Sequence, residues 1–464
     1  MYDLAVIGGG PGGYVAAIRG AQQGLKVILV EKDSLGGTCM NRGCIPTKCF
    51  FYDTTTLEAA KTSQVLTGAG RLSIDPSKMV ARKRNVVNML VSGIEKIMKS
   101  YDIEVIQGFG ELIAPGRVMV HRANGLSKEY QSRHMILATG SKPALPEFIE
   151  VDGHYIQTTD DALDSNDIPA RLLIIGGGVI GVEVTGIYRT LGCEVTVLEL
   201  LPDILTTEDA DIRRAMLRLF EQRGVKIHLK AEVKEITLRD KEIEVAFEDE
   251  VRGIEILRVD RILVATGRMP VLDGIDTGKL DLKTEGPFVK TNERLETNLP
   301  GVYAVGDVIG GMMLAHKASA EAEAAIANIL GAKKEVKPER IPRCIWSFTE
   351  IGAVGLTEEE ARATGRPIRV GKFPFMNSGA AQAMGSVDGF AKIVGNAETG
   401  EVLGFHILGT HATDLIGESV LAMSTESVVE ELAEAVRPHP TFSETVMEAA
   451  MDWSGLAIHS PKKR

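Results

Sequence analysis

One layout of residues occurs twice in this chain and constrains its fold more than any other feature. Residues 4–33 read LAVIGGGPGGYVAAIRGAQQGLKVILVEKD, and residues 172–201 read LLIIGGGVIGVEVTGIYRTLGCEVTVLELL. Each copy has an apolar stretch, a G-x-G-x-x-G motif, a helical stretch with a further glycine, and a second apolar stretch that reaches a glutamate. The first glycine and the glutamate are 23 residues apart in both copies. The layout predicts two strand–turn–helix–strand segments.

The residue types in these segments are those that a dinucleotide requires. The first glycine allows the tight turn, the second lets the backbone approach a pyrophosphate, and the third permits close packing of helix on strand. The helix N-terminus then faces the phosphates, and the acid can accept hydrogen bonds from ribose hydroxyls. The glycines are Gly8, Gly10 and Gly13 in the first copy and Gly176, Gly178 and Gly181 in the second, and the acids are Glu31 and Glu199. We therefore expect two bound dinucleotides, and these should differ in kind because an enzyme rarely needs two copies of one.

Further apolar stretches extend both copies and suggest how the domains are arranged. Residues 134–140 (HMILATG) and 261–267 (RILVATG) are expected to be matching strands that close the two segments. Residues 301–308 (GVYAVGDV) form another apolar strand that ends at Gly306-Asp307, after the second copy. The first domain is therefore expected to be interrupted and then resumed.

The pattern changes from about residue 335. Residues 390–409 predict two strands joined by a turn at Glu398-Thr399-Gly400, and residues 425–453 predict helices around a proline-rich break. We expect an α/β protein with two Rossmann-like domains and a C-terminal α+β domain. The expected boundaries are 1–142 with 267–334, then 143–266, then 335–464.

Composition excludes several partners. The net charge of −11 argues against nucleic acid, because phosphate binding requires a basic face. There is no apolar run of 18 or more residues, so we expect no membrane-spanning helix. The chain starts MYDLAVIGGG without a recognisable signal or transit peptide, which makes the cytoplasm the expected location. No metal site is expected.

Two cysteines, Cys39 and Cys44, lie in the stretch GGTCMNRGCIPTK, and Cys39 follows Glu31 by eight residues. Zinc sites usually space their thiolates two to four residues apart, and a disulfide in a reducing compartment is usually catalytic. A regular helix would hold residues five apart too far from each other for a disulfide, so the loop must bend, and Gly43 allows this. The spacing alone does not decide between these uses. The remaining cysteines are expected to be small buried apolar residues: Cys49, Cys193 and Cys344.

Taken together, the motifs resemble those of the pyridine nucleotide–disulfide oxidoreductase family. They are GGTCMNRGCIPTK, the doubled glycine motif, YAVGDV, MLAHKA (313–318) and HPTFSE (439–444). The resemblance covers residues 3 to about 455 and is strongest to the branch whose members oxidise dihydrolipoamide. It implies FAD in the first domain, NAD in the second, and a homodimer formed by the third, in which each site takes its base from the other subunit.

The resemblance also implies roles for single residues. Cys44 would be the thiol against the flavin, and Cys39 the thiol that exchanges with the substrate. Lys48 would pair with Glu183 beside the flavin. Further FAD residues would be Thr38, Gly110, Gly140, Asp307 and Ala315, and further NAD residues would be Val233 and Gly267.

His439 would be the base and Glu444 its orienting partner. Without the resemblance, a histidine and a glutamate five residues apart would be a common surface pair. Two departures from the family pattern stand out: Arg437 occupies a position that is often a second histidine, and Arg42 lies between the cysteines where an apolar residue is common. Either could change substrate preference or the pKa of a thiol.

The implied activity is oxidation of protein-bound dihydrolipoamide to lipoamide with NAD⁺, through a Cys39–Cys44 disulfide and FAD. The partner would be a lipoyl-bearing protein of a 2-oxoacid dehydrogenase or glycine cleavage complex. A mercuric-type reductase would carry a cysteine pair near the C-terminus, where this chain reads AIHSPKKR. Glutathione reductase would need cations after Glu199, where LLPD stands, and soluble transhydrogenases lack the complete cysteine pair. A redox-inert flavoprotein scaffold is the alternative from a different class.

Overall fold

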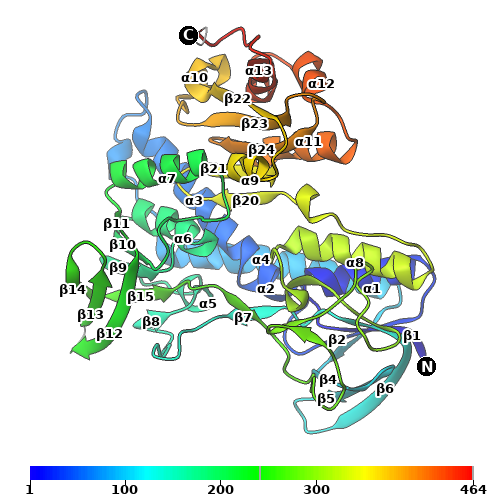
Figure 1. Cartoon of the computed structure of the whole chain (residues 1–464). Helices are drawn as coiled ribbons and strands as arrows, with labels where there is room; N and C mark the ends of the chain where they lie inside the picture. Colours follow the sequence, from blue (N-terminus) through cyan, green and yellow to red (C-terminus); the bar gives the residue numbers. More distant parts are fainter. Residues whose placement is uncertain (240–241, 462–464) are drawn as a thin grey trace. The chain divides into compact units, whose positions relative to one another are not determined.

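A computed structural model describes residues 1–239 and 242–461, which form two compact units. Unit 1 comprises Met1–Asp53, Ile74–Asp167 and Thr266–Val336. Unit 2 comprises Thr54–Ser73, Ile168–Ala265 and Lys337–Arg464. Figure 1 shows their helices and strands along the chain.

Unit 1 is built on a parallel sheet with the strand order β3-β2-β1-β6-β19. These strands are β1 (Tyr2–Ile7), β2 (Val27–Glu31), β3 (Glu104–Gln107), β6 (Ser127–Leu137) and β19 (Val302–Ala304). Antiparallel strands β4 (Phe109–Ala114) and β5 (Arg117–His121) extend β6. Strand β19 follows the second glycine motif in the chain, so the sheet of unit 1 uses segments from both sides of residues 168–265.

Alternating side chains of β1 bury both faces of this sheet. Leu4 and Val6 pack with helices α1 (Pro11–Gln22), α4 (Pro76–Ser100) and α8 (Ala315–Ile329), whereas Ala5 and Ile7 belong to a second core on the opposite face. A strand of a parallel sheet covered on both faces is expected to be apolar at every position, which explains the continuous run LAVI.

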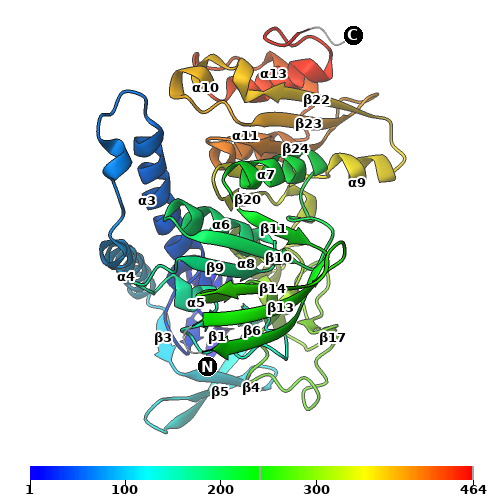
Figure 2. The same cartoon turned by 90° about the vertical axis from the view of Figure 1, so that its left-hand side faces the viewer.

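Unit 2 contains a second parallel sheet, in which β11-β10-β9-β15 are neighbours. These are β9 (Arg171–Ile175), β10 (Glu194–Glu199), β11 (Lys226–Leu229) and β15 (Arg261–Val264), with α6 (Val179–Thr190) between β9 and β10. A three-stranded antiparallel sheet consists of β12 (Ala231–Arg239), β13 (Glu242–Asp249) and β14 (Gly253–Val259), and Figure 2 shows it in green. Helix α7 (Ala210–Gln222) lies between β10 and β11 in the chain.

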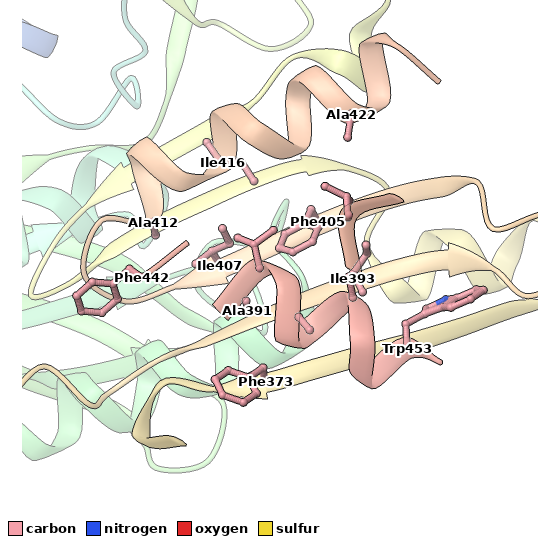
Figure 3. Packing of buried hydrophobic residues seen from close by; sticks show 14 of the residues in the cluster. Phe373, Ala391, Ile393, Phe405, Ile407, Ala412, Ile416, Ala422, Phe442 and Trp453 are labelled. Carbon is pink, nitrogen blue, oxygen red and sulfur yellow. The ribbon is translucent and has the colours of Figure 1, made fainter. Parts of the chain in front are cut away.

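The C-terminal part of unit 2 is an antiparallel sheet with the order β20-β21-β24-β23-β22. Its strands are β20 (Arg343–Trp346), β21 (Glu350–Gly355), β22 (Ile368–Pro374), β23 (Phe390–Asn396) and β24 (Val402–Leu408). Helices α11 (Ala412–Ser424), α12 (Val429–Glu434) and α13 (Glu444–Trp453) contribute to one core with it. Figure 3 shows Phe405 and Ile407 of β24 packed with Ile416 of α11 in this core. The two Rossmann-like folds and the α+β region expected from the sequence are thus confirmed.

A buried ionic cluster lies within unit 2, where α7 meets β23. The side chain of Lys392 is 2% exposed, and its Nζ lies 2.8 Å from Asp209 Oδ1, 3.0 Å from Asp211 Oδ2 and 2.9 Å from Glu358 Oε2. His406 of β24 is fully buried nearby, and its Nε2 lies 2.9 Å from the carbonyl oxygen of Leu356. A lysine is almost never buried unless it is paired, and here three carboxylates surround it.

The remaining helices and strands are short, apart from α3. They are α2 (Gly37–Asn41), α3 (Cys44–Thr62), α5 (Thr159–Ala162), α9 (Glu358–Ala363), α10 (Gly379–Met384), β7 (Ser141–Pro143), β8 (Ile156–Gln157), β16 (Arg268–Pro270), β17 (Thr284–Glu285) and β18 (Phe288–Val289). Single 3₁₀ turns occur at Ala69–Arg71, Gly306–Ile309, Pro338–Arg340 and Phe375–Asn377. Within 1–239 and 242–461, no helix combines the length and hydrophobicity that a membrane crossing requires.

Candidate active site

The first glycine motif forms a tight turn between β1 and α1. Gly8 has φ +103°, a conformation that favours glycine. A Cβ on Gly13 would lie 1.8 Å from the carbonyl oxygen of Gly8, so only glycine allows this helix to approach the strand so closely. A Cβ on Gly10, in contrast, would have Cα of Gly37 as its nearest neighbour, at 3.9 Å. The middle glycine is therefore much less closely packed than Gly8 and Gly13, and a side chain at this position would clash with no neighbour.

The second motif repeats this geometry between β9 and α6. Gly176 has φ +112°, and a Cβ on Gly181 would lie 1.9 Å from the Gly176 carbonyl oxygen. A Cβ on Gly178 would meet no atom within 4 Å. The two turns are thus equivalent: in both, the third glycine packs closely against the strand, and the middle glycine has room beside it.

The two acids hold the two turns in the same way. Glu31 Oε2 accepts a hydrogen bond from the Gly9 amide at 2.6 Å, and Glu199 Oε2 accepts one from the Gly177 amide at 2.5 Å. The other oxygen of each carboxylate accepts from an amide two residues further along, at 2.7 Å in both cases. Burial raises the pKa of Glu31, and the hydrogen bond from Gly9 acts in the opposite direction. Each acid thus sits at its turn with lone pairs left for a further donor.

The cysteine loop begins against the first turn. The Gly36 amide donates to the Gly9 carbonyl oxygen at 2.8 Å, and a Cβ on Gly37 would lie only 2.6 Å from Cα of Gly10. Helix α2 ends at Asn41, and α3 begins at Cys44. The bend expected near Gly43 is therefore present, because the two cysteines lie in separate helices.

The thiols of Cys39 and Cys44 lie within hydrogen-bonding distance of each other. This hydrogen bond, followed by burial and the charge of Cys44, raises the pKa of the Cys39 thiol, while the charge of Lys48 lowers it. Burial, followed by the charge of Cys39, raises the pKa of the Tyr14 phenol. Cys44 begins α3, where the helix dipole stabilises a thiolate. The two thiols are thus neighbours, as a redox pair requires.

Arg42, between the cysteines, forms ion pairs within unit 1. It contacts Asp33, and its Nη1 lies 3.9 Å from Asp160 Oδ2. A cleft of about 360 Å³ adjoins it, lined by Asp33, Ser34, Asn41, Arg42, Pro46, Lys83, Arg84, Val87, Asn88, Asp160, Leu163 and Asp164. Arg42 therefore links the cysteine loop to the segment after β2.

Asp307 lies in the 3₁₀ turn after β19 and is held by two residues that none of the sequence motifs identifies. Ser141 Oγ donates to Asp307 Oδ2, and Arg268 donates to Ser141 through Nε to Oγ at 2.7 Å and through Nη2 to the carbonyl oxygen at 2.8 Å. Ser141 and Arg268 each follow one of the ATG strands. This shared position could have singled out both residues. Their contact with each other could not be foreseen, because it joins distant parts of the chain.

A buried ion pair supports the same turn. Glu321 Oε2 accepts from the Gly306 amide at 2.7 Å, and Glu321 Oε1 lies 2.6 Å from Lys317 Nζ. Lys317 also donates to the Gly310 carbonyl oxygen at 3.1 Å. Burial raises the pKa of Glu321, and the charge of Lys317 opposes the shift. Lys317 belongs to MLAHKA, and its spacing of four from Glu321 on α8 was the available signal.

His439 and Glu444 are in contact. His439 Nδ1 lies 2.8 Å from Glu444 Oε1, and the Thr441 amide donates to Glu444 Oε2 at 2.8 Å. Burial raises the pKa of Glu444, but the hydrogen bonds from His439 and Thr441 outweigh it, so the pKa lies below its usual value. The imidazole itself is 76% exposed. The pair has the geometry of a base with an orienting carboxylate.

The other expected site residues are distributed over both units. Thr38 lies in α2, Gly110 in β4, Gly140 after β6 with φ +73°, and Ala315 at the start of α8. Val233 is buried in β12, and Gly267 follows β15 with φ +119°.

Lys48 and Glu183 are divided between the units. Lys48 belongs to unit 1 and Glu183 to unit 2, so their pairing stays a prediction. Glu183 Oε1 accepts from the Trp346 amide at 3.2 Å, within unit 2. Of the cysteines outside the pair, Cys49 and Cys193 are buried as expected, whereas Cys344 is only partly buried.

Known proteins resemble this chain over nearly its whole length. A family model described as pyridine nucleotide-disulphide oxidoreductase matches residues 2–322, and the dimerisation domain of the same family matches residues 341–450. A dihydrolipoyl dehydrogenase from Bacillus subtilis (strain 168) is 38% identical, with 99% of each chain covered.

Two solved structures show the same fold. LpdA from Mycobacterium tuberculosis matches with a TM-score of 0.90 and 26% identity, over 97% of this chain and 99% of that one. The Cu(II) complex of the HOCl-induced flavoprotein disulfide reductase RclA from Escherichia coli matches with a TM-score of 0.86 and 27% identity, over 97% and 98%.

Proposed function

Because this chain belongs to the pyridine nucleotide-disulphide oxidoreductase family, we propose that it oxidises protein-bound dihydrolipoamide to lipoamide with NAD⁺ as the acceptor. One observation carries the proposal: the Cys39–Cys44 pair lies on a loop that packs against the first glycine turn. A cysteine pair beside a dinucleotide site can take electrons from a dithiol substrate and pass them to the bound cofactor. The Bacillus subtilis relative, which matches this chain over 99% of both lengths, is named for this reaction.

The first glycine turn fits the pyrophosphate of FAD. Its middle glycine is open, its flanking glycines are closely packed, and α1 begins at Pro11 directly after it. The residues that would hold FAD are Gly8, Gly10, Gly13, Glu31, Thr38, Lys48, Gly110, Gly140, Asp307 and Ala315. When bound, FAD supplies a two-electron carrier between a thiol pair and a nicotinamide.

The second glycine turn fits NAD for the same reasons. The open position at Gly178 would take the pyrophosphate, and Glu199 would accept hydrogen bonds from a ribose. The residues that would hold NAD are Gly176, Gly178, Gly181, Glu199, Val233 and Gly267. A carboxylate at the ribose position favours NAD over NADP, because it repels a 2′-phosphate.

The cysteines perform the exchange with the substrate. One dihydrolipoamide thiolate attacks the sulfur of Cys39, which breaks the Cys39–Cys44 bond, forms a mixed disulfide and releases Cys44 as a thiolate. The second substrate thiolate then attacks the substrate sulfur, which closes the lipoamide disulfide and releases Cys39. The pair thereby gains the two electrons that the substrate loses. The α3 N-terminus stabilises the Cys44 thiolate in this role.

His439 accepts the proton of the attacking thiol. Glu444 accepts from Nδ1, so the free lone pair is on Nε2. Both residues lie in the segment matched by the dimerisation domain. We therefore assign His439 to the thiol pair of the partner subunit in a homodimer.

The domain boundaries proposed for this enzyme follow from the same assignment. An FAD domain comprises residues 1–142 and 267–334, an NAD domain residues 143–266, and an interface domain residues 335–464. The substrate would be the lipoyl group of a 2-oxoacid dehydrogenase or glycine cleavage complex.

The test is a substrate comparison with purified holoenzyme. We expect fast reduction of NAD⁺ by dihydrolipoamide, and much slower reactions of NADPH with glutathione disulfide or Hg(II). Faster turnover with either of the last two would replace the proposal with the corresponding reductase. A redox-inert flavoprotein would turn over none of them and would show no long-wavelength absorbance from a thiolate beside the flavin after dithiol is added.

A further inference from the structure

Arg437 precedes His439 by two residues, yet the two side chains have opposite environments. The Arg437 side chain is 8% exposed, whereas that of His439 is 76% exposed. Arg437 is one of the two positions at which this chain departs from the family pattern. Because its guanidinium is buried, it is not placed to meet a substrate from solvent.

The guanidinium joins three parts of unit 2. It forms an ion pair with Glu418 of α11 through Nη2 and Oε1. The same Nη2 donates to the carbonyl oxygen of Leu432 at 3.3 Å, and Nη1 donates to that of Ala435. Leu432 lies in α12 and Ala435 is its C-cap residue. The last carbonyls of a helix lack partners in the helix, and a cation placed there satisfies them and complements the helix dipole.

These contacts fix the start of the segment that carries the base. Glu444 holds the imidazole of His439 at one end and the amide of Thr441 at the other, so the C-terminal side of the segment is bound to α13. Arg437 binds the N-terminal side to α11 and α12. The segment between these two attachments is short, and His439 lies inside it.

We propose that Arg437 is a positioning residue for His439, which anchors the segment through Glu418 and the end of α12 without contacting the substrate. The inference rests on the proposed function, in which His439 is the base. A base must be held close to the position from which it takes its proton, and a displacement of about 1 Å can reduce the rate about 10²-fold. Histidine at position 437 could not replace these contacts, because an imidazole has two nitrogens whereas a guanidinium has five N–H donors in a fixed plane.

The test compares Arg437→Met with a matched control, Arg340→Met. Arg340 also combines an ion pair with a hydrogen bond to the end of a helix. Its Nη2 lies 3.1 Å from Glu426 Oε1, and its Nη1 donates at 3.3 Å to the carbonyl oxygen of Ser424, the last residue of α11. It is not attached to the segment that carries His439. We expect Arg437→Met to lower kcat about 10–100-fold with the KM for dihydrolipoamide within about twofold of wild type, and Arg340→Met to leave both near wild type. A raised KM with unchanged kcat would make Arg437 a substrate contact and overturn the proposal.

Hydrogen–deuterium exchange provides a readout that needs no substrate. Residues 436–443 should exchange faster in Arg437→Met than in wild type or Arg340→Met. Glu418→Gln, a milder change that keeps the arginine, should shift exchange and kcat in the same direction. The double variant should be no worse than Arg437→Met alone, because Arg437→Met already removes the ion pair with Glu418. If wild type does not oxidise dihydrolipoamide, the proposed function fails, but hydrogen–deuterium exchange still tests whether Arg437 anchors residues 436–443. Unchanged exchange of these residues in Arg437→Met would contradict the anchoring role.

Discussion

Nδ1 of His439 lies 2.8 Å from Oε1 of Glu444, and this contact determines which nitrogen of the ring can react. An ionised carboxylate only accepts hydrogen bonds, so Nδ1 must carry the proton and Nε2 must hold the free lone pair. The Thr441 amide occupies the other oxygen of Glu444, which prevents the carboxylate from turning away. The base is thus oriented before the substrate arrives.

Replacing His439 or Glu444 should therefore slow the reaction, and the replacement of His439 should slow it more. His439→Ala removes the base and should lower kcat about 10²–10⁴-fold, the usual contribution of a general base. Glu444→Gln keeps the shape but removes the charge that selects the tautomer, and should cost less than His439→Ala. Steady-state kinetics measure both, with the exposed Glu434→Gln as the control. Equal activities of Glu444→Gln and wild type would contradict the orienting role.

The two cysteines should have distinguishable roles. Cys44→Ser should abolish turnover and also the long-wavelength absorbance that a thiolate produces beside the flavin. Cys39→Ser should abolish turnover but retain that absorbance, because the Cys44 thiolate at the start of α3 remains. Visible spectra of the two holoenzymes decide the matter. Absorbance that survives in Cys44→Ser, and is lost in Cys39→Ser, would reverse the assignment.

Nicotinamide preference should follow the charge of Glu199. Wild type should have a kcat/KM for NAD⁺ about 10–100-fold above that for NADP⁺, since a carboxylate at the ribose repels a 2′-phosphate. The next residues, LLPD, contain no cation that could offset this. Glu199→Gln removes the charge while leaving an acceptor for the Gly177 amide, and should narrow the ratio. Comparable kcat/KM values for both nicotinamides in wild type would end this explanation.

Stability should fall in mild acid because His406 is buried. Burial is the main reason that the pKa of His406 is lowered from 6.5 to about 4; the charges of Arg343 and Lys392 also lower it, whereas Asp209 and the hydrogen bond with Leu356 raise it. The neutral ring accordingly stabilises the fold fully above pH 6.5, and this contribution is lost as the pH falls from 6.5 towards 4. Between pH 7 and 5 the loss amounts to about 2 kcal/mol.

Thermal unfolding of the holoenzyme measures this effect. His406→Gln cannot titrate and can still donate to the Leu356 carbonyl oxygen, so its Tm should fall less between pH 7 and 5 than that of wild type. The exposed His154→Gln is the control and should behave as wild type. Parallel pH curves for wild type and His406→Gln would show that another group governs the acid response.

Local geometry in this protein could be predicted from sequence, and the reason is visible at the glycine turns. The positive φ of Gly8 and the close approach at Gly13 are consequences of residues within one turn, so a motif carries them. The bend between α2 and α3 could be predicted for the same reason, because Cys39, Gly43 and Cys44 lie within six residues of each other. The contact of His439 with Glu444 also lies within six residues.

Contacts between distant segments could not be predicted in the same way. Ser141 and Arg268 meet beside Asp307 across more than a hundred residues, and no periodicity in the sequence encodes that distance. Arg437 is a further example, since its sequence position next to the base suggested an effect on the chemistry. Its burial against Glu418 depends on how α11 packs, which only the structure reveals.

Mixed dimers test whether His439 serves the thiol pair of its own chain or of the partner. His439→Ala and Cys44→Ser should each be inactive as homodimers while still binding FAD. In an isologous dimer, refolding equal amounts of the two together should give about half mixed dimers. If the base acts across the interface, each mixed dimer has one site with an intact cysteine pair and an intact histidine, and one site with neither.

About a quarter of wild-type activity should then return, because half of the dimers have one of two sites working. If the base acted within its own chain, every site in a mixed dimer would lack either the cysteine or the histidine, and no activity would return. Differently tagged variants purified through both tags provide the mixed dimer directly, and co-refolded wild type controls for losses on refolding. Confirmed mixed dimers that remain as inactive as their parents would place His439 beside the thiol pair of its own chain.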